Sequence, residues 1–290
     1  MYRFVFFVQT CLFCLIVLCF LEEIKNWSEK LKSKKKVIWK ILKSSKKSLE
    51  KYYFKQKTPL KNIQFAYILI IGDDMLTRKI ESQLIGWKRN PNKKPLIIKG
   101  CRQCGKTWSV CDFAKKNYKS VVYVNFFQNP DYKSIFSGSL EVDNLVMMLS
   151  AFLGSDTKFI ANETVIILDE IQECPEARTS LKFFKLDERF DVIGTGSLLG
   201  VSGYRTQPTS IPVGYETIMD MYPLDFEEFL WANGISKEII SLLETCLHDE
   251  KPVPEALHKR MSDLLIQYTI VGGMPDAVQT FVNTKQLNNI

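Results

Sequence analysis

The stretch GCRQCGKT, residues 100–107, decides the fold, because it fits the pattern GxxxxGK[ST] and directly follows a short apolar run, LIIK, at 96–99. Glycine near each end lets the backbone turn tightly, so that successive amide N–H groups point at phosphate oxygens. Lys106 offers a positive charge to β- and γ-phosphates, and the Thr107 hydroxyl is placed to bind Mg2+. The following TWSVCDFAKKN has helical spacing, and a helix N-terminus favours an anion. We expect a phosphate-binding loop made of Gly100, Cys101, Arg102, Gln103, Cys104, Gly105, Lys106 and Thr107.

A second motif, TVIILDE at 164–170, is an apolar run typical of a strand buried on both faces, and it ends in two acids. On their own, these acids would better suit the first turn of a helix, where the helix dipole stabilises negative charge. With a phosphate loop upstream, we expect Asp169 to hold Mg2+, directly or through water, and Glu170 to act as the general base on the attacking water. A base directly beside the metal ligand favours ATP over GTP. Residues 92–95 are NKKP and do not fit NKxD, the motif that recognises guanine.

A third apolar run, FDVIGTGS at 190–197, ends in polar residues. In P-loop enzymes with an acidic strand of this kind, a polar residue at the end of the neighbouring strand senses the γ-phosphate or orients the water. Thr195 and Ser197 are the candidates. The alternative is an ordinary Gly/Ser turn that opens a helix. The predicted catalytic residues so far are Glu170 and Lys106, and the predicted metal ligands are Thr107 and Asp169.

Helical periodicity recurs outside these motifs. The segment after Met75 is amphipathic through Ile80, Leu84 and Trp87 and ends before Pro91. Residues 140–153 carry an apolar face that predicts a core helix. Two further helices are expected in ISKEIISLLETCL, from residue 235, and in PEALHKRMSDLLIQY, from residue 254.

From Met75 to about Phe281, the sequence in and between these motifs closely resembles a prokaryotic family of AAA-type ATPases. The stretches that carry it are RKIESQLIGW, IKGCRQCGKT, VIILDEIQECPEARTSLKFF, DVIGTGSLLGV, IPVGYETIMDMYPLDFEEFLWANG and YTIVGGMPDAVQTF. The resemblance implies an α/β fold, a P-loop NTPase parallel sheet flanked by helices, with the nucleotide at the carboxyl edge of the strands and a mainly helical C-terminal segment after it. The resemblance also places Ser197 at the family's sensor position, which makes it the third predicted catalytic residue. Arg102 and Gln103 match the family's usual RQ.

The resemblance also implies a domain plan. Family members usually carry a second domain of unknown function with a nuclease-like fold, and this chain, of 290 residues, contains only its beginning. We expect an N-terminal extension over 1–74, a P-loop ATPase domain over 75–222 and an incomplete second domain over 223–290. AAA proteins often receive a catalytic arginine from a neighbouring subunit, and such an arginine would require this chain to form a homo-oligomer. Arg178, Arg189 and Arg205 qualify by position and none by motif.

The N-terminal extension allows two interpretations. Residues 4–21 form an apolar stretch of roughly 27 Å as a helix, and lysines follow, so it reads either as a membrane anchor with the ATPase domain in the cytoplasm or as translation assigned too early. A signal peptide fits less well. Eight irregularly spaced cysteines indicate reduced thiols in the cytoplasm, and the pairs Cys11/Cys14 and Cys101/Cys104 lack the further ligands of a zinc site.

Charge does not favour nucleic acid as a partner. The net charge is +7, but residues 1–74 hold 15 Lys+Arg and 6 Asp+Glu, which leaves 24 and 26 for the other 216, a balance of −2. We expect an ATPase that hydrolyses ATP with Mg2+ and is coupled to a C-terminal effector region of unknown target. A nucleotide-dependent switch with negligible turnover and a truncated, inactive family member are the alternatives.

Overall fold

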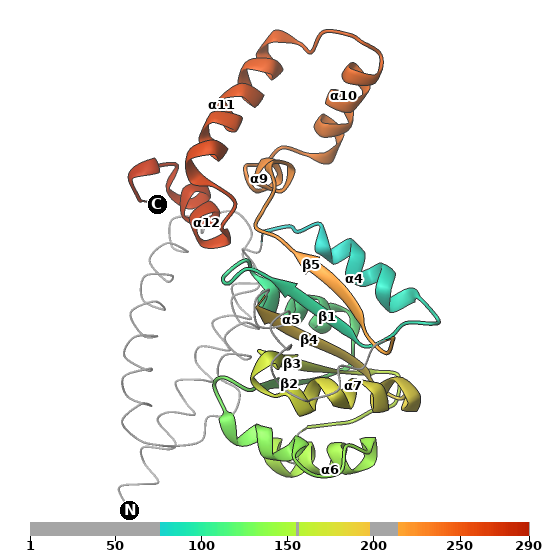
Figure 1. The fold of residues 1–290 in the computed structure, drawn as a ribbon. Helices are drawn as coiled ribbons and strands as arrows, with labels where there is room; N and C mark the ends of the chain where they lie inside the picture. The colour runs from blue at the N-terminus through green and yellow to red at the C-terminus, as the bar shows by residue number, and fades with distance from the viewer. Residues whose placement is uncertain (1–75, 155–156, 198–213, 290) are drawn as a thin grey trace, which may run out of the picture. The chain divides into compact units, whose positions relative to one another are not determined.

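Five parallel strands form one sheet in the computed structural model, which describes residues 76–154, 157–197 and 214–289 (Figure 1). The strands are β1 (Leu96–Gly100), β2 (Ser120–Asn125), β3 (Thr164–Asp169), β4 (Asp191–Ser197) and β5 (Thr217–Met221). Their order in the sheet is β2-β3-β4-β1-β5, so β4 lies between the strand that leads into the phosphate loop and the strand that ends in Asp169. The predicted parallel sheet flanked by helices is confirmed.

Helices cover both faces of this sheet because successive side chains of each strand point to opposite faces. On one face, Leu96 and Ile98 pack with α4 (Ile80–Arg89) and α5 (Lys106–Asn117). On the other face, Ile97 belongs to a cluster with η2 (Pro130–Phe136), α6 (Val142–Leu153), η3 (Ile171–Glu173) and α7 (Pro175–Asp187). Every residue of β3 is buried, as its unbroken apolar run predicted.

The last described segment is helical, as predicted. It consists of α9 (Phe226–Ala232), α10 (Lys237–His248), α11 (Glu255–Val271), α12 (Pro275–Thr284) and η5 (Leu287–Asn289). A separate apolar cluster holds α9, α11 and α12 together around Phe229, Leu264 and Phe281. The division into domains at 74/75 and 222/223 stays a prediction.

The helices expected near residues 80, 140, 235 and 254 are present as α4, α6, α10 and α11. In α4 the buried residues are Ile80, Leu84 and Trp87, the three that periodicity had assigned to its apolar face. The apolar stretch 4–21 and the rest of the N-terminal extension lie outside the described residues. Within the described ranges, no helix is both long and apolar enough to cross a bilayer.

Candidate active site

The loop at 100–107 joins β1 to α5, and glycine is required at two of its positions. Gly105 adopts a φ of 94° immediately before α5, a conformation that L side chains rarely take. At Gly100, a Cβ atom would lie 2.1 Å from the carbonyl oxygen of Met221, because β5 runs directly beside the end of β1. The pattern that predicted the loop thus has a steric reason at one glycine and a conformational reason at the other.

Lys106 lies inside the loop, with only 9% of its surface exposed. Its Nζ donates to the carbonyl oxygens of Gly100, at 3.1 Å, and Cys101, at 2.6 Å. Two neutral carbonyl groups therefore hold the ammonium over the loop. A phosphate oxygen carries negative charge and is a stronger acceptor, so it can take their place. Cys101, Arg102 and Gln103 are exposed at the outer side of the loop.

The loop meets the acidic strand through Thr107, whose Oγ1 lies 3.1 and 3.2 Å from the two carboxylate oxygens of Asp169. These residues are 62 positions apart in the sequence and come together because β3 ends level with the start of α5. A hydroxyl and a carboxylate are oxygen ligands of the kind that Mg2+ prefers, so the pair fits the predicted metal.

Asp169 is a buried carboxylate, 4% exposed, at the centre of a polar cluster. Besides Thr107, its donors are Tyr123 Oη at 2.6 Å, Asn125 Nδ2 at 2.9 Å, Thr195 Oγ1 and the backbone N–H of Glu170 at 3.1 Å. A buried carboxylate costs free energy unless its lone pairs are satisfied, and here each oxygen accepts several hydrogen bonds. The arrangement fixes the carboxylate in one orientation.

Burial, and then the negative charge of Asp169, raises the pKa of the Tyr123 hydroxyl far above its usual value of 10. Tyr123 therefore keeps its proton and remains a donor to Asp169. Burial likewise raises the pKa of the Cys111 thiol, on the neighbouring helix α5, so Cys111 stays neutral.

Glu170, the predicted base, is half-buried and follows β3 in the left-handed conformation, with a φ of 54°. A non-glycine residue with this conformation is uncommon. Gln172 donates from its side-chain amide to the Glu170 carboxylate, while the other amide atom, Oε1, is buried without a hydrogen bond in the described structure. The reverse orientation of this amide would place its oxygen against the carboxylate, so Gln172 is fixed as a donor to Glu170.

The two sensor candidates occupy different places. Thr195 is fully buried and donates to Asp169, whereas Ser197 pairs with Gly100 across β4 and β1 and is half-buried beside the start of the loop. The structure thus brings both to the site, Thr195 by direct contact with the acid. The assignment of Ser197 as the sensor stays a prediction.

Sequence reasoning missed Tyr123, Asn125 and Gln172. Asn125 ends the apolar run SVVYVN and is paired in register with Asp169, so a polar residue at the carboxyl end of a parallel strand was a usable signal. Tyr123 lies two residues earlier, on the same side of β2. No local pattern marks Gln172, because its role depends on the turn that follows Glu170.

The remaining candidates are a loop cysteine and the three arginines considered for contact with a neighbouring subunit. Burial raises the pKa of the Cys104 thiol, and its Sγ lies 3.6 Å from the Met221 carbonyl oxygen. Arg178 forms a buried bidentate pair with Glu216, with distances of 3.1 and 2.5 Å, so it is held within its own chain. Arg189 contacts Asp187 and Asp143, while Arg205 lies outside the described residues.

Comparison with known proteins adds a family match. Residues 92–230 match the model of a family described as an AAA domain. No curated protein sequence matches the chain.

Among solved structures, the chain is similar to a Walker-type ATPase of Pyrococcus abyssi, at 14% identity and a TM-score of 0.43, over 75% of this chain and 71% of that one. It is also similar to PCH-2 of C. elegans, at 11% identity and a TM-score of 0.42, over 78% and 67%. The ORC1 protein of Aeropyrum pernix, solved in complex with DNA, gives 13% identity and a TM-score of 0.37, over 76% and 68%.

Proposed function

We propose that this chain binds ATP with Mg2+ in the loop at 100–107 and hydrolyses it, with the cycle coupled to the C-terminal helical region; the match of residues 92–230 to the model of an AAA domain supports this. The observation that carries the proposal is the contact between Thr107 and Asp169. It joins the phosphate loop to the acidic strand end, the two halves of a nucleotide-hydrolysing site.

Each group then has a distinct role in the proposed reaction. Backbone N–H groups of the loop and the Lys106 ammonium bind the β- and γ-phosphates, and Thr107 and Asp169 would hold Mg2+, which neutralises charge on the phosphate oxygens when bound. Glu170 accepts a proton from the water that attacks the γ-phosphorus, and the bond between that phosphorus and the β–γ bridging oxygen breaks to give ADP and phosphate. Ser197 orients the γ-phosphate or the water.

Two substitutions test the proposal. Lys106→Ala should abolish ATP binding, because it removes the charge at the centre of the loop. Glu170→Gln should leave binding intact and stop turnover, because the amide cannot accept the proton. Steady-state phosphate release and equilibrium ATP binding, measured on both variants, check these outcomes. Normal hydrolysis by the Glu170→Gln variant would show that another group is the base.

A nucleotide-dependent switch with little turnover is the second candidate, and the Gln172 contact favours it. An amide that donates to one oxygen of the Glu170 carboxylate competes at that oxygen with the attacking water. If this contact suppresses turnover, Gln172→Ala should raise the rate of phosphate release above that of the wild type. A lower rate would instead show that Gln172 holds the base in its working position.

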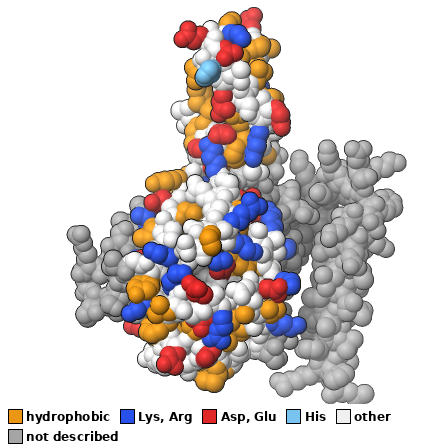
Figure 2. Space-filling model, turned by 90° about the vertical axis from the view of Figure 1, so that its right-hand side faces the viewer, with side chains coloured by type: hydrophobic (Ala, Val, Ile, Leu, Met, Phe, Trp, Pro, Cys, Tyr) orange, Lys and Arg blue, Asp and Glu red, His pale blue; other side chains and the backbone are white. Residues whose placement is uncertain are grey.

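We also propose an effector function for the C-terminal region and a homo-oligomeric assembly. The resemblance to a prokaryotic family with a nuclease-like second domain favours an effector function in the C-terminal region, and homo-oligomers are common for AAA proteins. On the face drawn in Figure 2, acidic side chains lie among the basic ones, which does not favour nucleic acid there. Phosphate release measured with and without DNA tests that partner.

A further inference from the structure

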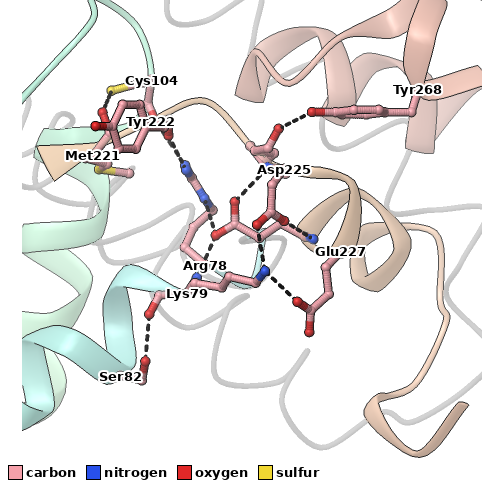
Figure 3. Close-up of polar contacts among 11 residues, drawn as sticks. Arg78, Lys79, Ser82, Cys104, Met221, Tyr222, Asp225, Glu227 and Tyr268 are labelled. Carbon is pink, nitrogen blue, oxygen red and sulfur yellow. Dashed lines mark hydrogen bonds and ion pairs between the residues drawn. The ribbon is translucent and has the colours of Figure 1, made fainter. Parts of the chain in front are cut away.

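Arg78 lies just before α4, at the start of the family-like stretch RKIESQLIGW, and no role was assigned to it above, yet its side chain is only 9% exposed. Its three guanidinium nitrogens donate to acceptors on three separate segments (Figure 3). Nη1 donates to the carbonyl oxygen of Cys104 at 2.9 Å, Nη2 to the carbonyl oxygen of Tyr222 at 2.6 Å, and Nε to Glu228 Oε1 at 3.1 Å. One side chain therefore connects the phosphate loop, the end of β5 and helix α9.

The contact with Cys104 determines the orientation of a peptide group in the loop. In a planar trans peptide, the C=O of one residue and the N–H of the next point in opposite directions. Since Arg78 binds the Cys104 carbonyl, the N–H of Gly105 points away from Arg78. Amide groups of this part of the loop are those that bind phosphate, so Arg78 fixes a phosphate donor without touching the phosphate.

The contact with Glu228 extends this arrangement to α9. Glu228 is 5% exposed, and its Oε1 also accepts from the backbone N–H of Lys79 at 2.6 Å. Its Oε2 accepts from the backbone N–H of Asp225 at 3.2 Å, while the Asp225 side chain accepts from the N–H of Glu228 at 2.9 Å. These last two bonds form the capping box that begins α9.

We propose that Arg78 is a positioning residue for the phosphate loop and links it to the start of α9. The inference rests on the proposed function, since it assigns Arg78 to the same nucleotide site. A change in the loop on nucleotide binding reaches the Cys104 carbonyl first, then Arg78 and the Glu228 carboxylate. Buried ion pairs contribute little net stability, so fold stability alone is a weak reason for this pair.

Three variants of the full-length chain separate positioning from folding. Arg78→Met alone leaves the Glu228 carboxylate buried without its counter-charge, which is expected to destabilise the fold. The double variant Arg78→Met/Glu228→Gln removes both charges and restores neutrality, but it leaves the Cys104 carbonyl unheld. Glu228→Gln alone keeps the guanidinium on the loop. Arg89→Met, a substitution of an exposed arginine at the end of α4, is the matched control.

The readout is the Kd for ADP with Mg2+, measured by calorimetry because ADP is not turned over, beside urea unfolding of each variant. We expect the double variant to bind ADP about tenfold more weakly than the wild type, equivalent to about 1.4 kcal/mol. Glu228→Gln and Arg89→Met should bind as the wild type does. If the double variant unfolds, Arg78→Lys serves instead, since one ammonium keeps the charge but cannot replace three separate donors.

Hydrogen exchange at α9 gives a readout that a merely structural role would not change. ADP should slow exchange across residues 226–232 in the wild type, and this protection should be lost in the double variant. Unchanged ADP affinity in a folded variant that lacks Arg78 would overturn the inference. The proposed function fails separately, if Lys106→Ala binds ADP as tightly as the wild type.

Discussion

Replacing Tyr123 by Phe should weaken the site through a single lost hydroxyl. That hydroxyl donates to Asp169 Oδ2 at 2.6 Å, and tyrosine and aspartate are 6% and 4% exposed, so water has little access to replace it. A hydrogen bond to a charged group is worth about 1.5–3 kcal/mol. We therefore expect the free energy of unfolding to fall by about 2 kcal/mol, because the ring itself keeps its packing.

The same hydroxyl also orients the carboxylate that is proposed to hold Mg2+. Loss of a group that orients a metal ligand typically costs about 10–100-fold in metal affinity or activity. Phosphate release by the Tyr123→Phe variant should therefore need about tenfold more Mg2+ for half-maximal rate. The measurement is a titration of MgCl2 at fixed, saturating ATP, beside urea unfolding followed by tryptophan fluorescence.

The chain contains a matched control in Tyr118, whose hydroxyl donates to Asp191 Oδ2 at the same distance, 2.6 Å. Burial and a nearby aspartate raise the pKa of both hydroxyls. Asp191, however, begins β4, while the site lies where the strands end. Tyr118→Phe should lower stability comparably and leave the Mg2+ dependence unchanged. Equal effects of the two substitutions on Mg2+ dependence would refute the role of Tyr123.

Three further outcomes are expected. Gly100→Ala should cost at least about 1–3 kcal/mol in urea unfolding, since its Cβ would lie 2.1 Å from the Met221 carbonyl oxygen. Gly86→Ala, in α4 with nothing within 4 Å, should instead stabilise by about 0.5–1 kcal/mol, and equal effects would contradict the steric reason. Cys101 is exposed, so iodoacetamide should label it in the native protein. ADP with Mg2+ should slow this labelling, as measured by peptide mass spectrometry, and an unchanged rate would contradict nucleotide binding in the loop. Burial opposes ionisation of Asp225, but Lys79 holds its pKa below 3.8, so its stabilising effect is lost as pH falls through that lowered value. Asp225→Asn should therefore make unfolding less pH-dependent below about pH 4, and an unchanged acid limb would argue against this role.

The parts of the fold that follow from local pattern could be predicted from the sequence. The loop at 100–107 and the run at 164–170 each carry their chemistry within a few residues. Periodicity identified Leu84 and Trp87 as buried positions of α4. The resemblance implied a parallel sheet but no strand order, because the sequence of a single strand does not specify which strands will be its neighbours.

The parts that were missed depend on contacts between distant segments. Arg78 and Glu228 are 150 residues apart, and nothing near either one indicates a partner. Tyr123 and Asp169 meet because β2 and β3 pair in one particular register. Hydrophobic patterning specifies which face of a strand is buried, but the polar partner across the sheet follows from register and strand order together.

The shared carboxylate of Glu228 limits how this chain can be divided for engineering. The same group caps α9 and neutralises Arg78, so a cut at residues 222/223 would separate Arg78 from its buried partner. A fragment cut there would keep the guanidinium beside the phosphate loop while losing its counter-charge. Chimeras and minimal fragments should therefore carry α9 with the sheet, and a natural replacement at position 78 should be accompanied by a change at position 228.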